Sequence, residues 1–168
     1  MNYQKAVEAV LYILSQFKEE GLNTYNLLKM VFAADKYHLN KYGRPVTGDT
    51  YIKMNYGTVP SVIYEYIKQD PIALSTIADK ECPFFNKEHN TFSNRDYKPE
   101  FLSESDEEAL NYGKKEYENL TFNQVKEKNH YEKCWVETGM NMPIDFELMI
   151  DDEEIINDLK ENSVNIIL

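Results

Sequence analysis

Several features that would assign a protein class are missing from this sequence of 168 residues. It contains no apolar run near the about 18 residues that a transmembrane helix needs, so no membrane contact is expected. Its first residues carry charge inside the apolar stretch and lack a small-residue cleavage site, which argues against a secretory signal peptide. The only two cysteines, Cys82 and Cys134, are too few for a disulfide framework. We therefore expect free thiols and a cytoplasmic location.

Signatures of catalysis and of metal or cofactor binding are also missing. The segment GRPVTGDT at 43–50 lacks the lysine and the glycine spacing of a phosphate-binding loop. No serine lies in a G-x-S-x-G elbow, and neither cysteine belongs to a paired zinc motif. His89 and His130 are isolated in the sequence. The sequence thus predicts a protein that is not an enzyme and that binds no metal and no cofactor.

Positive charge is scarce, with a formal net charge of −11. This balance argues against nucleic acid as a partner, because phosphate contacts need clustered Lys and Arg. The charge is also uneven: residues 1–69 hold 8 basic and 6 acidic side chains, and residues 70–168 hold 10 and 23. The acidic part either attracts a basic protein surface or is a solvated face that keeps the protein soluble. Both interpretations remain open at this point.

What is present is a mostly helical pattern. The apolar content of 42% is enough to build a core, and the length suggests a single compact domain over 1–168. Apolar residues at helical spacing, caps and glycine stops predict helices over 3–19, 24–41, a stretch from Ser61 to just before Pro71, 72–79, 105–119, 121–129 and a terminal segment from 151. Residues 51–54 alternate like a strand, Gly57 and Pro60 suggest a turn, and 84–92 suggest a hairpin. The predicted class is mainly α with a minor β element.

The second predicted helix carries an anomaly. At 100° per residue, Asp35 falls in the middle of an apolar stripe, and His38 lies one turn further on at its edge. A buried carboxylate must be paired or hydrogen-bonded. The nearest donors in the sequence belong to the following glycine loop, including Arg44 and Thr47. Three interpretations follow: the pair pins the loop to the helix, it forms a binding surface, or it forms an acid–base or metal site.

Aromatic side chains are plentiful, with 13 tyrosines and one tryptophan, Trp135. Tyrosine is enriched at interfaces because it offers a large contact area at low entropic cost. Tyr37, Tyr56 and Tyr64 lie in the stretch from Ala34 to Ile67 and are candidates for partner binding. We expect Trp135 to fill part of the core.

The stretch from Ala34 resembles the Panacea, or SocA-like, antitoxin family. The family pattern is a helix ending in ADK.HL.KYGRP.TGDTY, then a strand and G.VPS..Y. Weaker agreement continues along the chain, in FLSESDEEAL and MPIDFELMIDDEE, so the resemblance spans essentially all of it. Departures from the family pattern are minor: the helix over 105–119 carries Gly113, and 72–100 shows no convincing motif. The scaffold residues that the pattern implies are Asp35, His38, Tyr42, Gly43, Arg44, Pro45, Thr47, Gly48, Asp49, Tyr51, Pro60 and Ser61.

The resemblance implies a toxin–antitoxin component of a bacterial or phage-infected cell. Members of the family neutralise diverse toxins encoded beside them, chiefly by direct protein binding, so the implied partner is a cognate protein toxin. One branch acts as a proteolytic adaptor that delivers its toxin to a ClpXP-type AAA+ protease, which is the first alternative. The second alternative is a phage or mobile-element protein of another purpose that shares only the fold.

Overall fold

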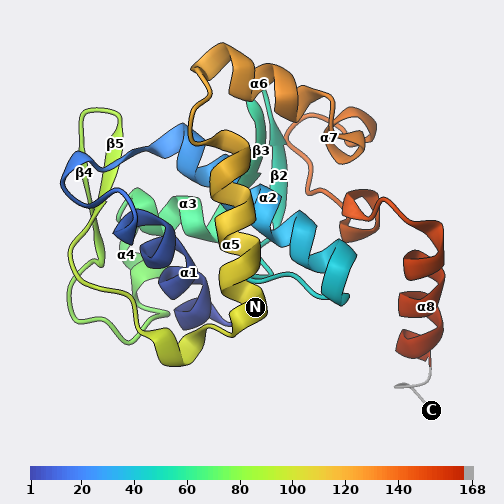
Figure 1. Ribbon diagram of the computed structural model, residues 1–168, viewed down its shortest axis with the longest axis horizontal. Helices are drawn as coiled ribbons and strands as arrows, with labels where there is room; N and C mark the ends of the chain where they lie inside the picture. Colours follow the sequence, from blue (N-terminus) through green and yellow to red (C-terminus); the bar gives the residue numbers. More distant parts are fainter. Residues whose placement is uncertain (165–168) are drawn as a thin grey trace.

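Three helices form the centre of the fold, which we describe for residues 1–164 of a computed structural model. Helices α1 (Tyr3–Ser15), α2 (Thr24–Tyr42) and α5 (Glu104–Tyr117) pack together, and α5 crosses in front of α2 (Figure 1). Side-chain caps begin all three, because Asn2, Asn23 and Ser103 each accept a backbone N–H of the first turn. Gly43 ends α2 with a left-handed φ of 73°, which glycine adopts at little cost.

A glycine in the middle of α5 explains how closely the two longest helices approach. A Cβ atom at Gly113 would lie 2.2 Å from the backbone oxygen of Met30 and 3.0 Å from the backbone nitrogen of Ala34. Only a residue without a side chain fits there. The glycine that looked out of place in the helix pattern therefore lets α5 lie directly against the backbone of α2.

The strands form two small antiparallel sheets. Strand β1 (Leu22–Asn23) pairs with β5 (Asn90–Ser93), which pairs with β4 (Phe84–Lys87). Strand β2 (Tyr51–Met54) pairs with β3 (Gly57–Pro60), and the segment 141–144 runs along the other edge of β2. The predicted hairpin over 84–92 is therefore present, and β1 adds a third strand to it. The tip of this hairpin projects at the upper left of the view (Figure 1).

Shorter helices surround this centre, and two apolar clusters fill it. The remaining elements are α3 (Ser61–Ile67), α4 (Pro71–Leu74), α6 (Phe122–His130), α7 (Lys133–Glu137), α8 (Glu153–Val164) and the 3₁₀ turns Lys18–Glu20, Pro99–Phe101 and Phe146–Met149. The larger cluster lies between α1, α2, α3 and α5, and the smaller one lies under the 3₁₀ turn Phe146–Met149. The class predicted from the sequence, mainly α with a minor β element, is confirmed.

Two predicted helices are shorter than expected. The first ends at Ser15 rather than 19, because the chain turns so that Leu22 can pair with Thr91 across the sheet. The helix predicted over 72–79 ends at Leu74. There the hydroxyls of Ser75 and Thr76 donate to carbonyl oxygens of the same turn and compete with its continuation.

Two other local predictions were wrong. Gly57 and Pro60 lie in strand β3, not in a turn, and the turn falls at residues 55–56. Trp135 is not a core residue: it is half-exposed, it stacks on His130 with ring centroids 3.8 Å apart, and the Lys53 ammonium lies 4.1 Å from its ring centroid. Its indole N–H donates to a backbone carbonyl at 3.0 Å, which keeps the ring at the surface. No helix in the described part of the chain is both long and apolar enough to cross a membrane.

Candidate functional site

Asp35 forms the first part of the site, at the centre of the resemblance pattern. It is fully buried on α2, and its carboxylate faces the loop that follows the helix. Thr47 donates its backbone N–H at 2.8 Å and also its hydroxyl, and the Tyr51 hydroxyl donates at 2.8 Å. Burial raises the pKa of Asp35 to about 6, although these donors oppose the rise. The hydrogen bonds expected between Asp35 and the loop are therefore present.

His38 lies one turn further along α2 and joins the loop to α5. Its Nδ1 is 2.6 Å from the carbonyl oxygen of Arg44, which fixes Nδ1 as the protonated nitrogen of the neutral ring. Nε2 then accepts from the Ser105 hydroxyl at 3.0 Å. Burial lowers the pKa of His38, against the effect of the Arg44 carbonyl. The imidazole therefore bridges the loop and α5, and its Nε2 also lies 3.5 Å from a carboxylate oxygen of Asp106, whose charge opposes the lowering of the pKa.

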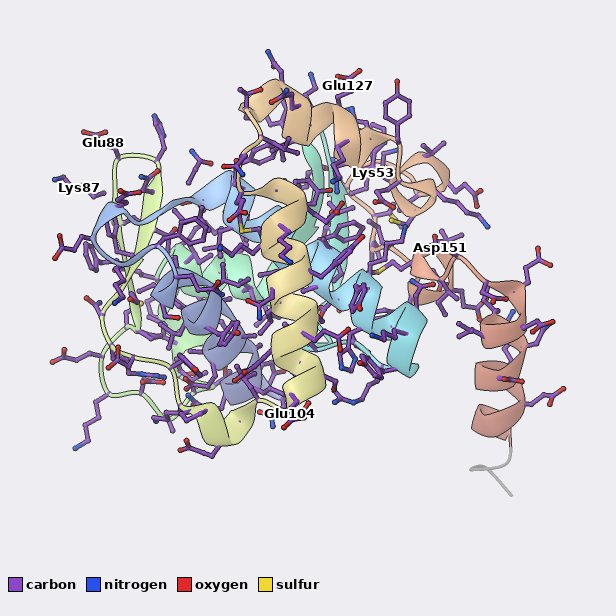
Figure 2. All side chains as sticks on the ribbon, in the orientation of Figure 1. Lys53, Lys87, Glu88, Glu104, Glu127 and Asp151 are labelled. Atoms are coloured by element: carbon purple, nitrogen blue, oxygen red, sulfur yellow. The ribbon has the colours of Figure 1, made fainter. Side chains whose placement is uncertain are left out.

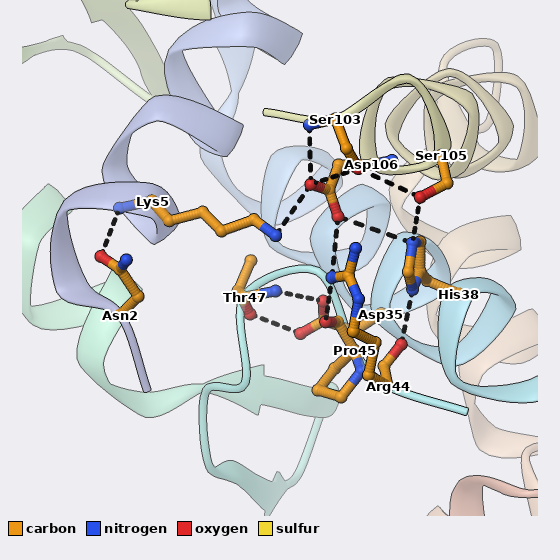
Figure 3. A network of polar contacts seen from close by, with 10 residues as sticks. All are labelled: Asn2, Lys5, Asp35, His38, Arg44, Pro45, Thr47, Ser103, Ser105 and Asp106. Carbon is orange, nitrogen blue, oxygen red and sulfur yellow. Dashed lines mark hydrogen bonds and ion pairs between the residues drawn. The ribbon is translucent and has the colours of Figure 1, made fainter. Parts of the chain in front are cut away.

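Asp106 on α5 completes the arrangement, and the sequence indicated it only as an acid in a first helical turn. Its carboxylate pairs with the Lys5 ammonium at 2.8 Å and the Arg44 guanidinium at 3.1 Å, and it accepts the Ser103 backbone N–H at 2.9 Å (Figure 3). Burial alone would raise the pKa of Asp106, but the bonds to Lys5 and Ser103 hold it at about 2. One ionised carboxylate thus ties α1, α5 and the loop together.

Asp49 ties the same loop to α3. It accepts the backbone N–H groups of Val62 at 3.0 Å and Ile63 at 2.8 Å, which are the free donors of the first helical turn. Ser61, where the sequence predicts this helix to begin, is its first residue, and its hydroxyl donates to Asp49 at 3.3 Å. The N-cap is Pro60, which has no side-chain acceptor, so the cap comes from a residue 12 positions before Ser61.

We call these contacts the hallmark network, formed by Asp35, His38, Arg44, Thr47, Asp49, Tyr51, Ser105 and Asp106. Around it, Gly43 and Gly48 both adopt left-handed φ values, Pro45 is partly buried, and the half-exposed Tyr42 donates its hydroxyl to Glu108 at 2.6 Å. Every buried side-chain nitrogen and oxygen in the described residues has a hydrogen-bond partner. In that same part of the chain, no three His, Cys, Asp or Glu side chains form a group that could hold a metal ion. The network is built to hold a loop in place.

The three candidate partner-binding tyrosines fall on two different surfaces. Tyr37 stacks on Tyr112 with ring centroids 4.3 Å apart, donates its hydroxyl to Glu108, and lines a polar hollow of about 410 Å³ between α2 and α5. Tyr56 and Tyr64 line a second and larger hollow. The structure therefore groups Tyr56 with Tyr64 and separates both from Tyr37.

We call this larger hollow the aromatic groove, and its volume is about 740 Å³. It lies where the start of α2, the β2–β3 turn, α3 and the tip of the β4–β5 hairpin meet, and Phe122 at the start of α6 closes one side. In Figure 2, Lys87 and Glu88 mark the hairpin tip and Glu127 marks α6, with the start of α2 between them. Its main apolar and aromatic lining residues are Tyr25, Leu28, Met54, Tyr56, Val59, Tyr64, Ile67 and Phe122.

A buried lysine also lines this groove. Lys29 on α2 is fully buried, its ammonium donates to the carbonyl oxygen of Thr58, and it lies 5.0 Å from the ring centroid of Tyr25. Burial lowers the pKa of Lys29 to about 7. Tyr25, Lys29 and Phe122 were not singled out from the sequence. No local pattern marks the burial of Lys29, because lysine is usually a surface residue.

Comparison with known proteins gives the class of this chain. The profile of the family described as antitoxin SocA-like, Panacea domain, matches residues 27–136. This range contains α2 from Leu27 onward, the hallmark network apart from its Lys5 partner, and most of the aromatic groove. The chain therefore belongs to the SocA-like Panacea antitoxin family. No curated protein and no solved structure matches it.

Proposed function

We propose that this protein neutralises a protein toxin by binding it directly, in the cytoplasm of a bacterial or phage-infected cell. Membership of an antitoxin family carries the proposal. The two regions of the structure support it in different ways. The polar groups of the hallmark network form hydrogen bonds within the protein. In the aromatic groove, by contrast, Tyr56 is 55% exposed and Phe122 is 47% exposed. Exposed aromatic side chains beside a hollow are typical of interface anchors.

The lack of a catalytic arrangement also supports a binding role. The His38–Ser105 pair resembles part of a nucleophilic site, but Nδ1 of His38 faces a backbone carbonyl, and neither residue lines the polar hollow beside Tyr37 or the aromatic groove. A nucleophile needs a space in which substrate can bind. We therefore propose that the protein is not an enzyme and that the pair serves the fold.

Electrostatic attraction is proposed as the second contribution to binding. The acidic balance of residues 70–168 would steer a basic toxin toward this protein, mainly by raising the association rate. Raising the salt concentration should then slow association and leave dissociation almost unchanged, since exposed charges are screened over about 8 Å at physiological ionic strength. Association that does not respond to salt would show that the acidic part is only a solvated face.

The experiment that tests the proposal is co-expression with the product of the neighbouring gene in a bacterial host. We expect that product alone to arrest growth, this protein to restore it, and the two to co-elute as a complex. Failure to restore growth together with no complex would overturn the proposal. Restored growth that requires a ClpXP-type protease, with the toxin disappearing from the cells, would instead identify a proteolytic adaptor.

A further inference from the structure

The aromatic groove has a wall that is already ordered before any partner binds. The Phe122 ring packs against Tyr25 and Tyr56, with ring centroids 4.7 Å and 5.4 Å apart, and the Tyr25 hydroxyl donates to the backbone carbonyl of Tyr56. These contacts join the β2–β3 turn to α2 and α6. Side chains held in place in this way lose little conformational entropy on binding, which favours affinity.

The size of the groove suits side chains rather than a whole domain. Its volume of about 740 Å³ lies within the range of pockets that enclose compact apolar groups. Leu28, Val59 and Ile67 add aliphatic side chains to the lining. A surface of this composition gains free energy by removing apolar side chains from water.

The neighbouring sheet edge cannot recruit a partner strand. At β3, the backbone N–H of Thr58 already donates to the Asn129 side chain at 2.6 Å, and its carbonyl oxygen accepts from the Lys29 ammonium. Strand addition needs such groups to be free. Strand addition at the β3 edge is therefore blocked at Thr58, and this edge offers a partner side chains rather than free backbone groups.

Charge narrows the choice of partner segment. The charged side chains that line the groove are Lys29, Lys68 and Glu88, so acidic side chains are not in excess there, in a protein with a net charge of −11. Lys68 pairs with Glu65 at 2.8 Å, and Lys29 is buried beneath the surface. The groove thus lacks the excess of acidic side chains found in the protein as a whole. It does not favour a Lys- or Arg-rich segment.

We propose that the aromatic groove binds a short segment of the partner protein that presents aromatic or aliphatic side chains and carries no excess positive charge. The inference rests on the proposed function only in naming that partner as the toxin. It divides binding between two surfaces: the acidic part attracts the partner at long range, and the groove holds an apolar, neutral or acidic segment of it.

Selection of random displayed peptides on the full chain tests this without knowledge of the toxin. We expect the enriched peptides to share aromatic or aliphatic residues and to lack net positive charge. Tyr56→Ser and Phe122→Ser should weaken their binding by about tenfold or more, because each removes an exposed aromatic anchor. Tyr131→Ser is the matched control, since Tyr131 is 80% exposed and lies outside the groove.

Three results would overturn the inference: no enriched peptide, enrichment of Lys- and Arg-rich peptides, or binding that the two groove variants and the control affect equally. The growth assay separates this outcome from failure of the proposed function. If the groove variants restore growth as well as the wild type does, the antitoxin role stands and the groove is not its binding site. If peptides bind the groove but growth is never restored, the groove serves another partner.

Discussion

Among the buried ionisable side chains of helix α2, Asp35 and Lys29 have different surroundings. Three hydrogen-bond donors from the following loop and strand surround the Asp35 carboxylate. The Lys29 ammonium donates to a carbonyl oxygen and lies beside the ring of Tyr25, at the base of an open groove. The C-terminal half of α2 therefore organises a closed polar network, and its N-terminal half supports a surface with room for a ligand. The comparison suggests that the C-terminal half of α2 stabilises the fold and that its N-terminal half supports the binding of a partner.

The largest loss of stability should come from removing the Asp35 carboxylate in the C-terminal half of α2. Asp35→Ala would leave the Thr47 and Tyr51 donors buried without an acceptor, which we expect to lower the free energy of unfolding by about 3 kcal/mol or more. Asp35→Asn keeps one acceptor oxygen and should cost less. Urea unfolding of both variants measures the difference. An Asp35→Ala variant with an unchanged melting temperature and lost toxin binding would place Asp35 in the interface instead.

Gly113→Ala should have the next largest effect. The added methyl group would collide with the backbone of Met30, so α5 and α2 must separate, at an expected cost of about 2 kcal/mol. Thermal unfolding provides the measurement, and Lys115→Ala, at an exposed position of the same helix, provides the control. Equal melting temperatures for the two variants would mean that the helices do not pack as closely as described.

Burial of Lys29 should make the stability of the protein depend on pH. Burial lowers its pKa from 10.5 to about 7, so between these values the unfolded chain binds more protons than the folded one, and stability rises with pH. Replacing it in Lys29→Met should remove a rise on the order of 2 kcal/mol between about pH 7 and 9.5. Unfolding by urea at several pH values measures this, with Lys115→Met as the control. Parallel profiles for wild type and Lys29→Met would contradict it.

Asp35 should show the opposite dependence at lower pH. Burial raises its pKa from 3.8 to about 6, so the folded state binds more protons in this interval, and this group's contribution to stability falls as pH increases through it. The stability of wild type relative to Asp35→Asn should therefore decrease from about pH 4 to pH 6. A relative stability that increases over this window would show that the loop donors outweigh the burial of the carboxylate.

The smallest effect on stability should come from a substitution in the aromatic groove. Tyr56→Ser changes an exposed side chain, so the free energy of unfolding should shift by less than about 0.5 kcal/mol. Toxin dissociation should nevertheless become faster, since a buried aromatic anchor contributes about 2 kcal/mol to binding. Kinetic binding measurements with Tyr131→Ser as the control test this. A destabilised variant with unaltered dissociation would assign Tyr56 to the fold rather than to binding.

Much of the hallmark network could be predicted from the sequence, and little of the groove could. Asp35 was detectable because an acid in an apolar stripe requires donors, and the nearest ones follow within 16 residues. Asp106 was not, since the carboxylate that pairs with Arg44 lies 62 positions further along the chain. The groove joins Tyr25 to Phe122, nearly 100 positions apart, and no local pattern links them. The burial of Lys29 could not be predicted either, because lysine is usually a surface residue.

The sequence by itself determined the positions of the main helices, several of their caps and the buried position of Asp35, because these follow from apolar spacing and from hydrogen bonds within a few residues. The capping box of Thr121 and Gln124 formed as the local pattern requires. The tertiary structure alone decided that Gly57–Pro60 is a strand, that Asp49 caps α3 from a distance, and that three aromatic rings meet at one groove. Each of these depends on groups that meet only when distant segments pack, and a short-range pattern carries no record of that contact.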